Sequence, residues 1–205
     1  IGTALHGIEM SRRQRETFLS AIRAVVSVSE MREPEAEGHS ARVARLAAAI
    51  GRRIPLKERE LARLRLAALL HDVGKAAVPA RMLEEEGVHD PDHSAEHAKR
   101  GEKITASISG SEDLAPSIRH HHESWDGNGF PDGLSGTDIP LFSRVVAAAD
   151  RIDHIVRDSV TADSVADAKR LLEEESGVKL DPAIVATACE ALDEMLRGNS
   201  RNGEK

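Results

Sequence analysis

Apolar residues recur at intervals of three or four along most of the chain, which is the spacing of helices that bury one face. Between residues 11 and 31, this spacing groups Phe18, Ile22 and Val25 on one side of a helix. The same pattern predicts further helices at about residues 39–50, 56–74, 94–108, 112–122, 140–156, 162–175 and 182–196. No two segments alternate as the strands of a hairpin would. The sequence therefore predicts an all-α protein.

Residues with strong backbone preferences mark two helix ends. Asp181 is a suitable N-cap, and Pro182 suits the first position of the last helix. Gly74 is expected to end the third helix, because glycine is common just past a helix C-terminus. The adjacent residues His71 and Asp72 are therefore expected at the C-terminal end of that helix.

Composition supports the helical prediction and narrows the classes of partner. Hydrophobic residues make up 40% of the chain, but aromatic residues only 2%, and tyrosine is absent. The net charge of -7 argues against the broad basic surface that a nucleic-acid polymer requires. The single cysteine, Cys189, excludes an internal disulfide. No apolar run approaches the ~20 residues of a membrane span, so we expect no membrane insertion and a cytoplasmic location.

The chain is long enough for one principal domain with a short additional element. We expect residues 1–32 to form an N-terminal helix, residues 33–197 the principal domain, and residues 198–205 a disordered tail. Because the chain begins with Ile1 rather than methionine, we interpret it as a piece of a longer protein. The N-terminal helix is then the expected link to an upstream regulatory domain, and a homodimer is a further expected association.

The adjacent pair His71 and Asp72 is the first indication of chemistry. Imidazole and carboxylate ligands suit divalent metal ions, and one carboxylate can bridge two ions about 3.5–4 Å apart, as in two-metal phosphoester cleavage. A His-Asp pair also occurs as an ordinary ion pair at a helix end. For the dipeptide alone, the structural interpretation is preferred.

Other ligand types recur on separate segments: Glu35, His39, His97, His121, His122 and Asp150. Glu35 and His39 are four residues apart, so they share one helix face if that helix begins early. Asp150 follows an apolar helix face and needs a partner if it is buried. Eight potential ligands on five segments favour a metal site in the core over scattered surface charge. His120, the first of three adjacent histidines, is interpreted as a bystander.

The order of these motifs resembles the HD-GYP family, a branch of the HD-domain metal-dependent phosphohydrolases associated with hydrolysis of cyclic di-GMP. The resemblance covers roughly residues 33–192 and rests on the segments HSARV, HDVGK, HAKRG and HHESWDGNGFPDGLSGTDIPLFSRVVAAADRID. It implies an HD-type bundle of about seven or eight helices, with two or three divalent ions, iron or manganese, in its core. The implied metal ligands are Glu35, His39, His71, Asp72, His97, His121, His122 and Asp150.

The resemblance also implies roles for individual residues. Asp72 would bridge two ions, and Glu35 would support a third. Lys75 would stabilise the charge that develops at the scissile phosphate in the transition state. The loop that carries Gly-Phe-Pro in place of Gly-Tyr-Pro would line the substrate groove, through Asp126, Gly127, Gly129, Phe130 and Pro131.

Two departures from the family pattern concern the substrate. Phe130 replaces the namesake tyrosine and so lacks a hydroxyl, whose hydrogen bond would be worth ~1 kcal/mol. After Asp150, the family usually continues with basic groups for the substrate phosphates, whereas this chain reads DRIDHIVRDSVTAD. Arg151 and Arg157 are the expected substitutes, and Arg151 is the predicted substrate contact. His154 is interpreted as a solvated or hydrogen-bonding histidine.

Three hypotheses follow. The leading one is a metal-dependent phosphodiesterase that hydrolyses a cyclic dinucleotide, cyclic di-GMP to pGpG and/or GMP, by attack of a metal-bridging hydroxide. The second keeps this chemistry but changes the substrate to another nucleotide, as the altered segment after Asp150 would allow. The third is a binding or scaffold module that recognises a cyclic dinucleotide without turnover. The intact ligand set favours catalysis.

Overall fold

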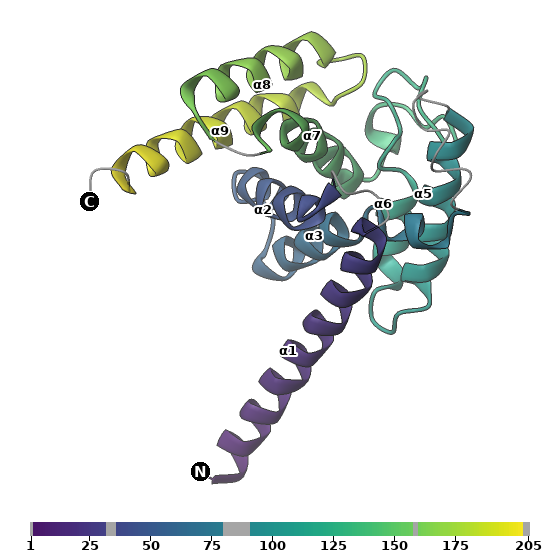
Figure 1. The fold of residues 1–205 in the computed structure, drawn as a ribbon, viewed down its shortest axis with the longest axis vertical. Helices are drawn as coiled ribbons and strands as arrows, with labels where there is room; N and C mark the ends of the chain where they lie inside the picture. Colours follow the sequence, from purple (N-terminus) through teal and green to yellow (C-terminus); the bar gives the residue numbers. More distant parts are fainter. Residues whose placement is uncertain (1, 32–35, 80–90, 158–159, 203–205) are drawn as a thin grey trace.

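The structure, a computed structural model, describes residues 2–31, 36–79, 91–157 and 160–202. Within these ranges, the regular structure is helical, and the only bridge of β type is an isolated one between Ser176 and Leu180. The all-α prediction is confirmed. Figure 1 shows a compact group of helices from which one long N-terminal helix extends.

The described ranges contain eight α-helices and three short 3-10 helices. The number of α-helices confirms the expected seven or eight. The α-helices are α1 (Gly2–Glu30), α2 (His39–Gly51), α3 (Glu58–Leu70), α5 (Pro91–Ala106), α6 (Ala115–Arg119), α7 (Leu141–Val156), α8 (Ala162–Glu175) and α9 (Pro182–Asn202). The 3-10 helices are η2 (Val73–Ala77), η3 (Glu112–Leu114) and η4 (Gly136–Asp138).

Several helix ends differ from those expected from the sequence. The third helix ends at Leu70, because the chain turns at Asp72 and continues as η2. The helix expected at residues 112–122 divides into η3 and the short α6, with Pro116 in the first turn of α6, where proline is tolerated. The last helix continues to Asn202, so residues 198–202 are helical rather than disordered. Extending an existing helix needs no new nucleation.

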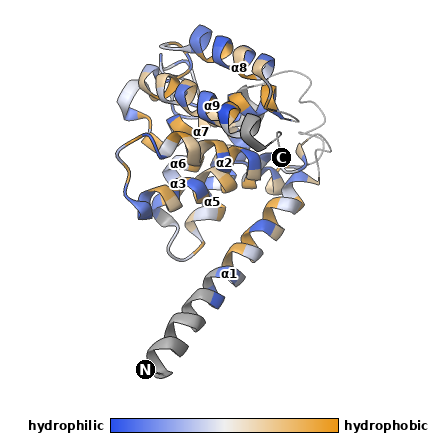
Figure 2. Ribbon diagram, turned by 90° about the vertical axis from the view of Figure 1, so that its left-hand side faces the viewer, coloured by the Kyte–Doolittle hydropathy of each residue, from blue (hydrophilic) through white to orange (hydrophobic). Residues whose placement is uncertain are grey.

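The main hydrophobic core lies between α2, α3, α7, α8 and α9. Its largest fully buried aliphatic side chains include Ile50 of α2, Leu64 of α3, Ile152 of α7, Leu172 of α8 and Leu192 of α9. Figure 2 shows apolar segments turned toward the interior of this bundle. The core therefore holds α2 against α7, and these two helices carry the predicted ligands His39 and Asp150.

A second, smaller core attaches α1 and the α5–α6 region to the bundle. Ile22 and Val26 of α1 pack with Leu70, Val73 and Ile118. The N-terminal part of α1 extends beyond this contact (Figure 1). In the described ranges, no helix combines the length and apolar character that crossing a bilayer requires.

Candidate metal centre

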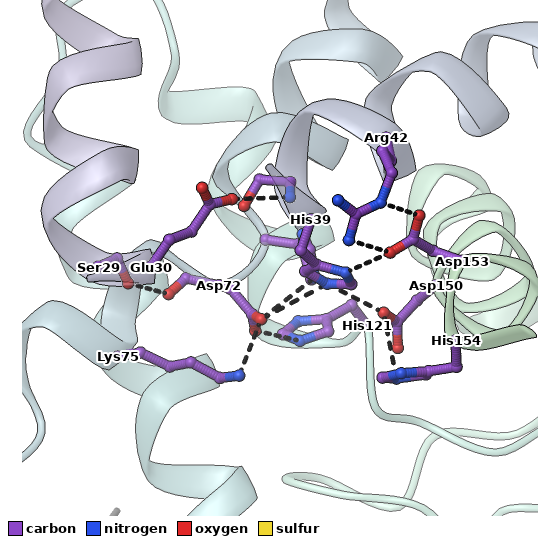
Figure 3. A network of polar contacts seen from close by, with 12 residues as sticks. Ser29, Glu30, His39, Arg42, Asp72, Lys75, His121, Asp150, Asp153 and His154 are labelled. Carbon is purple, nitrogen blue, oxygen red and sulfur yellow. Dashed lines mark hydrogen bonds and ion pairs between the residues drawn. The ribbon is translucent and has the colours of Figure 1, made fainter. Parts of the chain in front are cut away.

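The side chains predicted as metal ligands come together mostly at the ends of helices. They lie at the start of α2, in the turn between α3 and η2, within α5, directly after α6 and on α7: His39, His71, Asp72, His97, His121, His122 and Asp150. The structure thus gathers seven of the eight predicted ligands. The eighth, Glu35, lies outside the described residues. Figure 3 shows part of the cluster.

The imidazole rings of this cluster point their Nε2 atoms at one another. The Nε2 atoms of His39 and His71 are 3.4 Å apart, and so are those of His97 and His121. The Nε2 atom of His122 lies 3.0 Å from that of His97. These rings come from α2, the α3–η2 turn, α5 and the segment after α6, so the convergence requires the whole fold.

Hydrogen bonds at the Nδ1 atoms indicate which of these histidines carry a free lone pair on Nε2. Nδ1 of His71 donates to the carbonyl of Ala68 at 2.8 Å, and Nδ1 of His121 donates to the carbonyl of Ile118 at 2.6 Å. A neutral imidazole that donates from Nδ1 presents a lone pair at Nε2. Lone pairs that face one another at this separation repel unless a proton or a cation lies between them. The donor set of imidazoles and carboxylates therefore fits divalent metal ions.

Asp72 lies between two groups of histidines. Its Oδ1 is 3.3 Å from Nε2 of His97 and 3.8 Å from Nε2 of His121. Its Oδ2 is 3.5 Å from Nε2 of His71 and 3.9 Å from Nε2 of His39. Each carboxylate oxygen thus faces a different pair of imidazoles, and Asp72 belongs to two groups of side chains that can hold an ion, one with His97 and one with His39. This position suits the predicted bridging role.

His39 is held by two carboxylates of α7. Its Nε2 is 3.2 Å from Oδ1 of Asp150, and its Nδ1 donates to Oδ2 of Asp153 at 2.8 Å. Asp153 is 2% exposed and also receives two hydrogen bonds from Arg42, at 2.8 and 3.0 Å. Partners at the outer nitrogen orient a ligating histidine and raise its basicity.

The sequence analysis did not single out Asp153 or Arg42. Asp153 follows Asp150 by three residues and therefore shares its helix face, which is a signal that could have found it. Arg42 likewise follows His39 by three residues on α2, but its pairing with Asp153 depends on the packing of α2 against α7.

Burial and neighbouring carboxylates divide the metal-free site into two halves with different pKa values. Burial lowers the pKa of His97 to about 3 and that of His122 to about 4. At His39, burial acts in the same direction, but hydrogen bonds with Asp150 and Asp153 outweigh it and raise the pKa to about 10. The imidazoles of His97 and His122 therefore keep their lone pairs free at neutral pH. His39, in contrast, holds a proton that a metal ion must displace.

Lys75 lies next to the shared carboxylate. Its Nζ is 3.0 Å from Oδ2 of Asp72. Burial opposes ionisation of Asp72, but His71 and Lys75 hold the pKa of that carboxyl well below its usual value. Gly74 makes this placement possible, because a Cβ atom there would lie 1.9 Å from the carbonyl oxygen of His97 on α5. The glycine predicted as a helix end instead allows η2 to approach α5.

The Gly-Phe-Pro loop lies against the metal ligands. The Phe130 ring is 5.0 Å from the His122 ring, centroid to centroid, and its backbone N–H donates to the His122 carbonyl at 3.3 Å. A Cβ atom at Gly129 would lie 2.1 Å from the backbone nitrogen of Ser124, so this position needs glycine. Asp126 accepts hydrogen bonds from the backbone and side chain of Asn128 and so closes the turn. Substrate contacts by this loop stay a prediction.

A network of polar side chains holds the end of the same loop. Glu123 accepts hydrogen bonds from the backbone N–H groups of Asp132 and Leu134 at 2.9 and 3.1 Å. Arg119 donates to both oxygens of Asp132, and His120 lies 2.8 Å from one of them. His120 is thus outside the histidine cluster and anchors the loop. Although His120, Glu123 and Asp132 are close enough to hold an ion, the Arg119 guanidinium already neutralises Asp132.

Two further residues of α7 make polar contacts that bear on their predicted roles. Arg151, the predicted substrate contact, donates to both oxygens of Glu175 at 2.9 and 2.5 Å. Any contact of Arg151 with substrate must therefore share or break this ion pair, and the contact stays a prediction. His154, interpreted as a solvated or hydrogen-bonding histidine, lies at the edge of the cluster, with Nε2 3.7 Å from Oδ1 of Asp150.

Comparison with known proteins places this site in a family. Residues 24–184 match the sequence profile described as HD domain, which is most of the chain. The chain belongs to the HD-domain family. Its bundle and its paired His-Asp residues are those of an HD-domain protein, as the sequence predicted.

Similar proteins include two curated phosphodiesterases. A 3'3'-cGAMP-specific phosphodiesterase of Vibrio cholerae is 32% identical over 84% of this chain and 38% of its own length. A cyclic di-GMP phosphodiesterase of Thermotoga maritima is 33% identical over 83% of this chain and 48% of its own length. The chain therefore spans less than half the length of these relatives. A crystal structure of a Vibrio cholerae cyclic GMP-AMP phosphodiesterase shares the fold, with a TM-score of 0.68, 23% identity, and coverage of 86% of this chain and 48% of the other.

Proposed function

We propose that this domain is a metal-dependent phosphodiesterase that hydrolyses a cyclic dinucleotide, most directly cyclic di-GMP, to pGpG and/or GMP. The observation that carries the proposal is the pair of ligand groups that share Asp72, since shared carboxylates are typical of two-metal phosphoester cleavage. The names of relatives that are about one-third identical support the same reaction class.

Two ions would occupy the two halves of the site. His97, His121, His122 and Asp72 would hold one, and His39, His71, Asp150 and the same Asp72 would hold the other. We propose iron or manganese, which imidazole and carboxylate ligands suit, and a third ion supported by Glu35. Bound divalent ions polarise the phosphoryl group and make water a better nucleophile at neutral pH.

The protein's own residues position and stabilise the reacting phosphate. Asp72 remains ionised and links the two halves of the site, because one carboxylate oxygen faces His97 and the other faces His71. The Lys75 ammonium lies next to Asp72. From there we expect it to neutralise charge that develops on the phosphate in the transition state. Phe130 packs against the His122 ring, where it would limit access of water on that side. The cytoplasmic location, and a homodimer or an upstream regulatory domain, stay predictions.

The substrate needs a direct comparison, because the two curated relatives named above act on different cyclic dinucleotides and are equally similar to this chain. The protein should be freed of metal, reloaded anaerobically with Fe(II) or Mn(II), and assayed with bis(p-nitrophenyl) phosphate, cyclic di-GMP and 3'3'-cGAMP. We expect hydrolysis of the generic diester and at least one cyclic dinucleotide, and none by Asp72→Ala. A fully loaded protein that cleaves no phosphodiester would leave only the binding-module hypothesis.

A further inference from the structure

His154 lies at the solvent-exposed edge of the metal centre. It follows Asp150 by one helical turn on α7, and its ring stacks on His39 with centroids 5.9 Å apart and planes inclined by 26°. The side chain is 54% exposed, whereas those of His39 and Asp150 are 9% and 19% exposed. His154 is therefore the imidazole of this region that a molecule arriving from solvent meets first.

His154 makes one long polar contact with the metal ligands. Its Nε2 is 3.7 Å from Oδ1 of Asp150, which is longer than an ordinary hydrogen bond. Burial opposes ionisation of Asp150, but its contacts with His154 and His39 hold the pKa of that carboxyl well below its usual value. None of the groups of converging ligand atoms in the described residues includes His154. The ring thus borders the metal ligands without the geometry of a ligand, and a nearer acceptor would form a shorter hydrogen bond with its N–H.

Lys75 occupies the corresponding place beside the other carboxylate. Its Nζ contacts Asp72, just as the His154 ring approaches Asp150. In Figure 3, both side chains lie on the same side of the two carboxylates, with Lys75 near Asp72 and His154 near Asp150. A phosphodiester carries two non-bridging oxygens, so a phosphate bound over these carboxylates can meet a donor on each side.

We propose that His154 is a substrate-contacting residue that donates an N–H hydrogen bond to a phosphate oxygen on the Asp150 side of the site. Either neutral tautomer of an imidazole has one N–H, so the contact does not depend on a positive charge. The inference rests on the proposed function, because it assigns His154 to the phosphate group of that substrate. It also gives α7 a phosphate donor that does not require Arg151 to leave Glu175.

The test compares His154→Ala with His154→Gln, which keeps an N–H donor at similar reach. Metal content per chain, kcat and KM for the substrate, and calorimetric binding of inorganic phosphate to the metal-loaded protein should be measured for each. We expect His154→Ala to weaken phosphate binding and raise KM about tenfold, the usual effect of one hydrogen bond, with unchanged metal content. His154→Gln should recover most of this loss.

A matched control is Arg170→Ala on α8, which removes another exposed side chain, one that pairs with Asp167 in its own helix. It should behave as wild type. The inference is overturned if His154→Ala leaves KM and phosphate binding unchanged, or if it loses metal, which would indicate a structural role beside His39. Phosphate binding tests His154 even if no phosphodiester is cleaved, so failure of the proposed function remains distinguishable.

Discussion

Replacing Asp153 by asparagine should weaken one of the two metal positions and leave the other unchanged. The substitution keeps the shape of a side chain that is 2% exposed but removes its charge. Nδ1 of His39 then loses its carboxylate acceptor at 2.8 Å, and Arg42 loses its ionic partner. His39 becomes a less basic ligand and its ring is held less firmly, so the ion bound by His39 and His71 is affected.

The expected size follows from the contacts of this position. Loss of a carboxylate that supports a ligating histidine typically costs 10- to 100-fold in metal affinity, or about 1.4 to 2.7 kcal/mol. In the described contacts, His97 and His122 donate no hydrogen bond to Asp153, so their half of the site should keep its affinity. A chelator competition titration that resolves two binding steps should show one step shifted and one unchanged.

Asp132→Asn is the matched control. Asp132 is also a carboxylate paired with an arginine through both oxygens and with a histidine, here Arg119 and His120, but it holds the loop instead of a ligand. The control should leave both metal-binding steps unchanged. Equal weakening of both steps by Asp153→Asn, or an unaltered titration, would refute the assignment of Asp153 to the His39 half.

Three further predictions concern the same site. Metal binding at the His39 half should strengthen about tenfold per pH unit between pH 6 and 8 and release about one proton, because the metal-free pKa of His39 is about 10. Metal binding at the half containing His97 and His122 should show little pH dependence in this range, since the pKa values of these histidines are about 3 and 4. Calorimetry in buffers of different ionisation enthalpy checks both expectations. Lys75→Ala should retain metal but lose roughly a hundredfold in kcat, and an unchanged kcat would remove Lys75 from the mechanism. Glu35→Ala should lose about one equivalent of metal by elemental analysis, and unchanged stoichiometry would exclude its third ion.

Much of the fold was predictable because each helix buries one face, and that periodicity is local. The ligand types were also visible, since imidazoles and carboxylates stand out beside apolar helical runs, as at His71 and Asp150. Local sequence patterns could not predict which helices pack against each other. The contact of Arg42 with Asp153 exists because α2 packs on α7.

Two further features also depend on long-range packing. Gly74 was interpreted as the end of a helix, whereas its role comes from the close approach of η2 to His97 of α5, more than twenty residues further along the chain. His154 was interpreted as a solvated or hydrogen-bonding histidine, and its contact with Asp150 agrees with the second of these roles. Its position beside His39 depends on a residue more than one hundred positions away.

The most direct test of the account is the rate of phosphodiester hydrolysis measured against the number of metal ions bound per chain. Because Asp72 joins two separate ligand groups, we expect little hydrolysis of cyclic di-GMP or bis(p-nitrophenyl) phosphate after the first equivalent of Mn(II) or Fe(II). Activity should rise steeply as the second equivalent binds. Full activity with a single ion, or no hydrolysis of either compound when both positions are filled, would contradict a phosphodiesterase centre built around a shared Asp72.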